Sequence, residues 1–333
     1  MRIVICGGGS LGHTCAGVFS TRQDVIVDLY TNHPGRWNKT FKVNLPSGEH
    51  IIGKLDRVDN DPSHLIPQAD IVFLCLPAYL VEETILRIKP FLKKESIIGA
   101  VVGNSGIFIH CHKHLPQDTK IFSFQRVPYI SRVVEYGKEA NLLGYRDKLI
   151  MATENIVKRT MFREQMERLF GEPITLADSF YEVTLSNSNP ILHTGRLYTM
   201  WHNWDGTPFG RCSLFYKEWT DEASRLEIEM DNEFFALLNV LHVETNHIAT
   251  LLEHYESKNA EEMTAKLRSI PSLSTILSPM KKVEAGWLPD FTSRYFTEDF
   301  PFGLKLIRDL SQEHHLETPH IDQVLNWGLS ICH

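Results

Sequence analysis

The stretch RIVICGGGSLG, residues 2–12, decides the fold of the N-terminal half of the chain. Its first part, RIVIC, is a short run rich in β-branched residues, as in a strand buried on both faces of a sheet. Gly7, Gly9 and Gly12 then match the spacing GxGxxG, in which glycines permit a tight turn and a close approach of the backbone to a ligand. A plausible helix starts at Ser10, so the motif stands between a strand and a helix, the context that gives it meaning.

Outward from this motif, short apolar runs alternate with helix-like segments through the first half of the chain. Four runs rich in Val, Ile and Leu cover residues 2–6, 25–30, 71–76 and 97–102. A further strand, helix and strand are expected over residues 148–177. This alternation is typical of the α/β class, with a doubly wound parallel sheet of the Rossmann type.

The pattern changes after residue 178. From Tyr181 onward the chain shows long amphipathic stretches, almost no strand-like runs and several prolines that separate the helices. We therefore expect an N-terminal dinucleotide-binding Rossmann domain over residues 1–178. A mainly α-helical second domain, with the substrate-binding and catalytic groups, is expected over residues 179–333.

Composition excludes several classes of protein. The formal net charge is −7, and the chain has no basic tract with which to neutralise phosphates, so nucleic acid is not an expected partner. No apolar run approaches the roughly 20 residues of a membrane-spanning helix, and RIVIC is too short for a signal peptide. The 6 cysteines are scattered without a CxxC pair. We expect a cytoplasmic protein with no membrane partner, and a homodimer is one possible assembly.

The glycine motif predicts a site for a nicotinamide dinucleotide. Backbone N–H groups at the start of the helix, at Ser10 and Leu11, would meet the pyrophosphate beside the three glycines. Leu76 and Pro77 should lie near the nicotinamide ribose, because ligands of open α/β sheets collect at the carboxyl ends of the strands. Pro77 also has a purely structural explanation, since it removes an N–H and stops the strand.

The tip of the second strand favours NADP over NAD as the cofactor. NAD sites usually carry a carboxylate at this tip, about 20 residues past the motif. Here Asp28 falls inside the strand, and the tip offers Thr31, Asn32 and Arg36, which would suit a 2′-phosphate. The alternatives are NAD, or an Arg36 that is an ordinary solvated loop residue.

Two segments of the second half carry candidate catalytic groups. NPILHTG, residues 189–195, places His193 on the expected first long helix, and RYFTEDFPFGL, residues 294–304, brings an arginine and two carboxylates. A histidine beside an aspartate suffices for proton transfer, since imidazole titrates near neutrality and a carboxylate fixes its tautomer. From spacing alone, however, His193 would be a packed or surface residue more often than a catalyst.

The order of these motifs resembles the octopine/nopaline (opine) dehydrogenase family. An N-terminal GxGxxG is followed by RVPYISR (126–132), EYGK (135–138), NPxxHTG and RYxxEDxPFGL, so the resemblance covers nearly the whole chain. It implies an oxidoreductase that reductively condenses the amino group of an amino acid with an α-keto acid such as pyruvate. The reductant would be NADH or NADPH.

The resemblance also implies roles for individual residues. His193 would be the general acid/base, and Asp299 would orient it. Arg294 would bind a substrate carboxylate through its bidentate, permanently charged guanidinium. Asn189, one helical turn before His193, would either face the same site or cap the helix that begins at Pro190.

Two other functions stay open. A ketopantoate-reductase-like 2-keto-acid reductase shares the plan of a Rossmann and a helical domain. Such enzymes typically use a lysine on the first helix of the second domain, and residues 181–202 contain none. A non-catalytic NADP-binding sensor would keep the glycines and tolerate changes at His193 or Asp299, and both residues are present.

HCHKH, residues 110–114, has the composition of a metal-binding cluster. Alternate histidines in a strand would share a face, but this stretch follows a Gly-rich turn and would equally form a helix or a loop. We expect a polar connection here and no bound metal.

Overall fold

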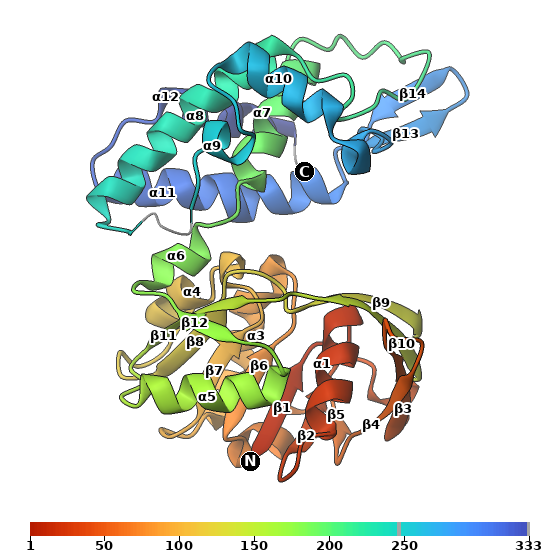
Figure 1. The fold of residues 1–333 in the computed structure, drawn as a ribbon, viewed down its shortest axis with the longest axis vertical. Helices are drawn as coiled ribbons and strands as arrows, with labels where there is room; N and C mark the ends of the chain where they lie inside the picture. The colour runs from red at the N-terminus through yellow and green to blue at the C-terminus, as the bar shows by residue number, and fades with distance from the viewer. Residues whose placement is uncertain (245–247, 332–333) are drawn as a thin grey trace. The chain divides into compact units, whose positions relative to one another are not determined.

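The computed structural model describes residues 1–244 and 248–331, and it forms two compact units, Met1–Ser186 and Asn187–His333 (Figure 1). The short helix α6 (Phe180–Thr184) contacts β11 and counts with the first unit. The first unit therefore extends a little past residue 178, where the sequence pattern changes.

The first unit is built on an 8-stranded sheet with the strand order β12-β11-β8-β7-β6-β1-β2-β5. The strands from β8 to β5 run parallel, whereas β11 is antiparallel to β8 and parallel to β12. The predicted α/β class with a doubly wound sheet is confirmed. The strands are β1 Arg2–Cys6, β2 Ile26–Tyr30, β5 Val58–Asp59, β6 Ile71–Leu74, β7 Ile97–Ala100, β8 Lys120–Phe124, β11 Leu149–Glu154 and β12 Ile174–Leu176.

Helices cover both faces of this sheet. Ile3 and Ile5 of β1 pack into one core with residues of α1 and α5, and Val4 and Cys6 pack into another with residues of α2, α3 and α4. A strand between two helical layers needs apolar side chains on both faces, which explains the unbroken apolar runs of the sequence. The helices are α1 Ser10–Ser20, α2 Pro62–Leu65, α3 Val81–Ile88, α4 Ile107–His114 and α5 Arg159–Phe170.

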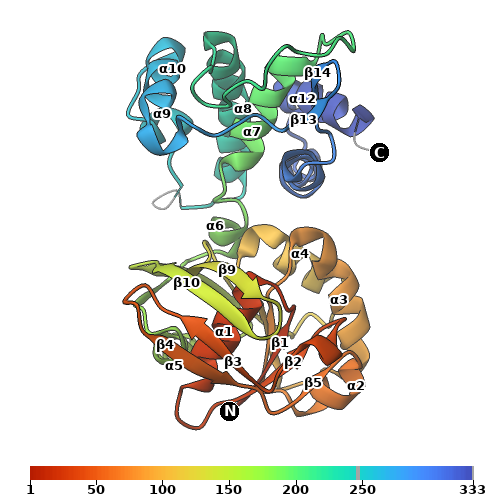
Figure 2. The same cartoon turned by 90° about the vertical axis from the view of Figure 1, so that its right-hand side faces the viewer.

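The sequence pattern does not predict the second sheet of this unit, which has 4 strands in the order β4-β3-β10-β9. Figure 2 shows its strands beside α1, which they contact. In β9, exposed positions hold apolar residues such as Ile130 and Val134, so the alternation of buried and exposed residues is not an alternation of apolar and polar ones. The strands are β3 Thr40–Asn44, β4 His50–Lys54, β9 Tyr129–Glu135 and β10 Glu139–Tyr145.

Helices dominate the second unit, as predicted. Helix α7 (Asn189–Trp201) contacts α8, α12 and a π-helical segment, Tyr295–Leu304. A hairpin of β13 and β14 is the feature that the sequence pattern misses. The other elements are α8 Asp221–Val240, α9 Leu251–His254, α10 Ala260–Ser269, β13 Met280–Val283, β14 Gly286–Pro289, α11 Lys305–Glu313 and α12 Pro319–Ile331. Across the described parts of both units, no helix is at once long enough and apolar enough to span a bilayer.

Candidate active site

The two motifs of the second unit meet because small residues let their helices approach closely. A side chain on Gly303 would place its Cβ 2.5 Å from Cγ of Pro190, in the first turn of α7. A Cβ on Gly195 would lie 2.6 Å from Cγ of Glu227 on α8. The glycines of NPxxHTG and PFG thus set how α7 packs against the π-helical segment and against α8.

His193 and Asp299 form a hydrogen-bonded pair across this contact. Nδ1 of His193 lies 2.8 Å from Oδ2 of Asp299, and the two side chains are only 12% and 18% exposed. Since a carboxylate only accepts, Nδ1 carries the proton and Nε2 has the free lone pair when the imidazole is neutral. The pair has the geometry of an oriented general acid/base.

Tyr216 is a partner of His193 that the sequence does not reveal. Its hydroxyl lies 3.0 Å from Nε2 of His193, so both ring nitrogens are engaged. Burial, together with nearby acidic groups that include Asp299, raises the pKa of Tyr216 above its ordinary value. The phenol is therefore neutral at physiological pH and donates to the imidazole. No motif spacing marks this residue, because it comes from the segment between α7 and α8.

Aromatic rings line the rest of the imidazole's surroundings. The ring centroids of Tyr295 and Phe215 lie 4.8 Å and 5.8 Å from that of His193. Burial, and then the charge of Asp299, raises the pKa of Tyr295. An apolar wall of this kind lowers the local dielectric and strengthens the attraction between an imidazolium and its carboxylate.

The two predicted substrate-binding residues lie at the surface. The guanidinium of Arg294 is 83% exposed and forms a forked pair with Glu298, at 2.9 Å and 2.8 Å. A substrate carboxylate would have to compete with Glu298 for this fork. Asn189 is exposed, and its backbone N–H donates to Oδ1 of Asn187. The substrate roles of both residues stay predictions.

In the first unit, the three glycines of GxGxxG have different structural reasons. Gly7 has a φ of +115°, and a Cβ there would lie 2.5 Å from the Cys75 carbonyl oxygen. A Cβ on Gly12 would lie 2.0 Å from the Gly7 carbonyl oxygen. A Cβ on Gly9 would meet nothing within 4 Å, so the backbone faces open space there. Gly7 and Gly12 shape the turn, and Gly9 leaves room for a ligand.

The start of α1 fits a pyrophosphate. Its N-cap, Gly9, offers no side-chain cap, and the first turn carries no acidic residue. N–H groups at such a helix start are free to donate to an anion. Ser10 already accepts a hydrogen bond from the Val133 N–H at 3.1 Å, and Leu11 packs partly into the core. These two residues would therefore contribute their backbone rather than their side chains.

His13 is a second residue that sequence reasoning misses. It is fully buried, its Nδ1–H donates to the Gly9 carbonyl at 2.8 Å, and its Nε2 accepts from the Gly137 N–H at 2.8 Å. Burial lowers the pKa of His13, which keeps the ring neutral. This histidine ties the glycine turn to the β9–β10 hairpin.

Thr31 and Arg36, at the tip of β2, meet at Tyr136. The hydroxyl of Thr31 lies 3.1 Å from that of Tyr136, and the guanidinium of Arg36 lies 4.6 Å from the centre of the same ring. Thr31 is buried, whereas Asn32 and Arg36 are exposed. Arg36 is thus an exposed residue that also makes a cation–π contact, and its role in cofactor binding stays a prediction.

The carboxylates next to this tip have other partners. Asp28 is fully buried and pairs with Arg2 and Arg57, at 2.8 Å and 2.5 Å. Asp59, paired in register with Tyr30, binds His64 and the Asp61 N–H. Both are therefore taken up by contacts within the protein.

Leu76 and Pro77 follow the end of β6 at Leu74, both half-buried. Cδ2 of Leu76 would lie 2.8 Å from a Cβ on Gly7, so Leu76 packs against the glycine turn. This agrees with the predicted position beside the cofactor, although their contact with it stays a prediction.

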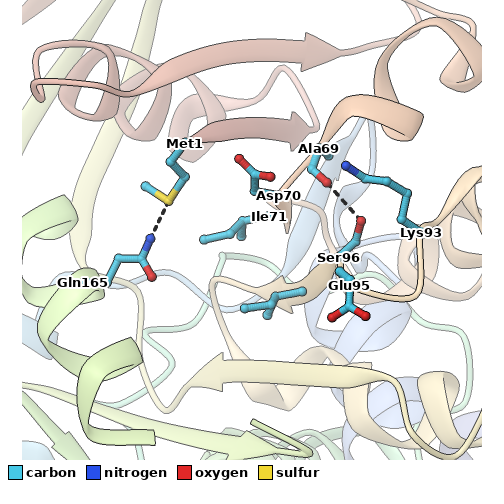
Figure 3. Close-up of a pocket in the computed structure, with 9 residues that line it drawn as sticks. Met1, Ala69, Asp70, Ile71, Lys93, Glu95, Ser96 and Gln165 are labelled. Atoms are coloured by element: carbon cyan, nitrogen blue, oxygen red, sulfur yellow. Dashed lines mark hydrogen bonds between the residues drawn. The ribbon is translucent and has the colours of Figure 1, made fainter. Parts of the chain in front are cut away.

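A cavity of about 280 Å³ lies elsewhere in the first unit (Figure 3). It is lined by residues at the amino ends of β6 and β7, including Asp70 and Ser96, and by Met1, whose sulfur accepts from Gln165. Ligands of open α/β sheets bind at the opposite, carboxyl ends of the strands. This cavity is therefore not the dinucleotide site.

A known protein family matches the second half of the chain. Residues 176–332 match the family described as NAD/NADP octopine/nopaline dehydrogenase, alpha-helical domain. The helical unit therefore resembles the α-helical domain of this family. The resemblance predicted from the motifs is thereby confirmed.

Curated proteins that are similar to this chain cover both of its units. An opine dehydrogenase from Haliotis discus hannai is 26% identical over 98% of this chain and 89% of the relative. A tauropine dehydrogenase from Arabella iricolor is 25% identical over 98% of this chain and 90% of the relative. The predicted enzyme class, an NAD(P)-dependent oxidoreductase, is confirmed.

Solved structures agree on the fold. Octopine dehydrogenase with NADH and L-arginine has a TM-score of 0.88 at 22% identity, covering 99% of this chain and 89% of that one. A ketopantoate reductase from Ralstonia eutropha has a TM-score of 0.65 at 14% identity, covering 99% and 98%. The ketopantoate reductase thus shares the general plan of this fold, but it is less similar to this structure than octopine dehydrogenase is.

Proposed function

We propose that this protein is an opine dehydrogenase, which reductively condenses the amino group of an amino acid with an α-keto acid such as pyruvate. The observation that carries the proposal is the hydrogen bond between His193 and Asp299, which joins two motifs far apart in the sequence. The curated relatives named opine, tauropine and octopine dehydrogenase support it. We also expect the protein to be cytoplasmic, with a homodimer as one possible assembly.

The reaction needs a group that moves protons. The amine and the keto group lose water to form an imine, and reduction of its C=N bond consumes one hydride and one proton. When bound, the nicotinamide supplies the hydride. His193 would take a proton from the incoming ammonium and donate one during dehydration, while Asp299 holds its tautomer and stabilises the imidazolium.

Tyr216 gives this mechanism a specific constraint. Its hydroxyl occupies Nε2 of His193, the nitrogen that has to exchange a proton with the substrate. A substrate polar atom would therefore either displace the hydroxyl or exchange protons through it. In both cases Tyr216 acts as a positioning residue that keeps the imidazole aligned before substrate binds.

NADP is the cofactor that we favour within the confirmed NAD(P) class. Thr31, Asn32 and Arg36 stand at the tip of β2, and the neighbouring carboxylates Asp28 and Asp59 are already paired. Replacing Arg36 with alanine should weaken NADPH binding by about tenfold and leave NADH binding within twofold, since a paired phosphate contributes about 1.4 kcal/mol. Equal weakening of both would argue for NAD.

The decisive experiment follows the absorbance of NADPH and NADH with a pool of α-keto acids and a pool of amino acids. Oxidation that requires both pools supports an opine dehydrogenase, and dividing the pools then identifies the pair. Oxidation with keto acids alone would favour the keto-acid reductase instead. If no oxidation occurs even with both pools present, while both nucleotides bind tightly, the result favours the sensor hypothesis.

A further inference from the structure

The sequence HCHKH forms the second half of a helix rather than a polar connection. Helix α4 ends at His114, and its apolar side, which includes Cys111, packs into the core against the sheet. His110 and His114 are one helical turn apart and share the side that faces α3. His112 points elsewhere, toward Glu154.

Glu82 of α3 lies between the two facing histidines. Its Oε1 is 2.6 Å from Nε2 of His114 and 3.8 Å from Nδ1 of His110. One ligand atom from each of the three residues lies within 4.8 Å of the others. Nδ1 of His110 is buried and has no hydrogen-bond partner within the described chain. A buried imidazole nitrogen left without a partner is costly unless something binds it.

We propose that Glu82, His110 and His114 bind one divalent transition-metal ion, best Zn²⁺. Two imidazoles and one carboxylate are a usual zinc donor set, and three protein ligands leave a fourth position for water or an anion. Ligand atoms around tetrahedral zinc are about 3.4 Å apart, so shifts of under about 1 Å would complete the site.

Two of the three groups, His110 and Glu82, are already in the protonation state in which they bind a metal. Burial lowers the pKa of His110, so this imidazole is neutral and has a lone pair to give. Hydrogen bonds from Lys113 and then His114 lower the pKa of Glu82 to about 2, so it is a carboxylate. Histidine and carboxylate ligands bind metals in these forms.

Lys113 is the competitor for this site. Its Nζ lies 2.8 Å from the same Oε1 of Glu82. Without a metal, Lys113, Glu82 and the two histidines form an ordinary ion-pair cluster. The lysine side chain is 63% exposed and can swing into solvent when an ion arrives. The metal would clamp α3 to α4, the helices that follow β6 and β7, and so brace the loops at the carboxyl ends of these strands.

The test titrates Zn²⁺ into the chelator-treated full chain by calorimetry and follows thermal unfolding. We expect one tight Zn²⁺ per chain and a higher unfolding temperature. His114→Ala and Glu82→Gln should each lower the affinity by at least about tenfold. His112→Ala, on the same helix but outside the cluster, is the matched control and should bind as the wild type does.

Lys113→Ala provides a test in which the Zn²⁺ affinity is expected to rise rather than to fall. Removing the competing ammonium should raise Zn²⁺ affinity by roughly 1.5- to 5-fold, the range of an exposed ion pair. The proposal is overturned by unchanged affinity in His114→Ala, by an equal loss in His112→Ala, or by weaker binding in Lys113→Ala.

Discussion

Each unit holds a histidine near the start of its first helix, fully buried at His13 and largely buried at His193, and the two histidines differ in their partners. The imidazole of His13, in the first turn of α1, bonds to two backbone groups, the Gly9 carbonyl and the Gly137 N–H. The imidazole of His193, in the second turn of α7, bonds to two side chains, those of Asp299 and Tyr216. Backbone partners hold one tautomer permanently, whereas side-chain partners can rotate away or exchange a proton. The comparison separates a histidine that shapes a turn from one that is suited to chemistry.

The largest expected effect tests the chemical role of His193. His193→Ala and Asp299→Asn should each lower kcat by about 10²–10⁴-fold, because proton transfer loses its base or the base loses its tautomer. Binding of NADPH, measured by fluorescence, should stay within twofold. Asp309→Asn, which changes a half-buried carboxylate on α11 that pairs with Lys305 and Arg308, is the control and should keep full activity. A dyad variant with nearly normal kcat would remove His193 from the mechanism.

The next effect tests the structural role of His13. His13→Ala should lower the free energy of unfolding by about 2–4 kcal/mol, because it leaves the buried Gly137 N–H unpaired and a cavity behind. Urea denaturation measures this loss. NADPH binding should weaken as the Gly9 turn loosens, while kcat at saturating cofactor should change less than threefold. A loss of kcat comparable to that of His193→Ala would erase the distinction between the two histidines.

A smaller effect concerns the phenol on His193. Tyr216→Phe removes one hydrogen bond to Nε2, worth about 1 kcal/mol, so kcat should fall about fivefold. Tyr198 lies on α7, as His193 does, and its hydroxyl accepts from Gln323 of α12. Tyr198→Phe should leave kcat unchanged. An increase in kcat for Tyr216→Phe would mean that the phenol only blocks the imidazole.

The smallest effect is a pH dependence of stability. Burial lowers the folded pKa of His13 below the ordinary value of 6.5, so the unfolded chain binds this proton more tightly. Stability should therefore fall as pH falls through 6.5 toward the folded pKa, by less than about 1.4 kcal/mol per pH unit. Urea titrations of wild type and His13→Gln between pH 7 and 5 should show a shallower slope in the variant. Equal slopes would mean that His13 titrates normally.

Contiguous features were predictable from the sequence. The glycine motif works through the backbone of one turn, so its spacing alone carries the information, and β1 follows its apolar run from Arg2 to Cys6. The pairing of His193 with Asp299 was available through the resemblance. The sheet containing β9 and β10 was not predictable by alternation, because several of its exposed residues are apolar.

The sequence by itself determined the α/β and helical halves, the dinucleotide motif and the family resemblance of the segments around His193 and Asp299, because these depend on local periodicity and on the order of motifs. Only the tertiary structure decided that His13 supports the turn, that Tyr216 occupies Nε2 of His193, and that His110 and His114 face Glu82. Each of these contacts joins separate elements, and its geometry follows from how helices and strands pack rather than from spacing along the chain.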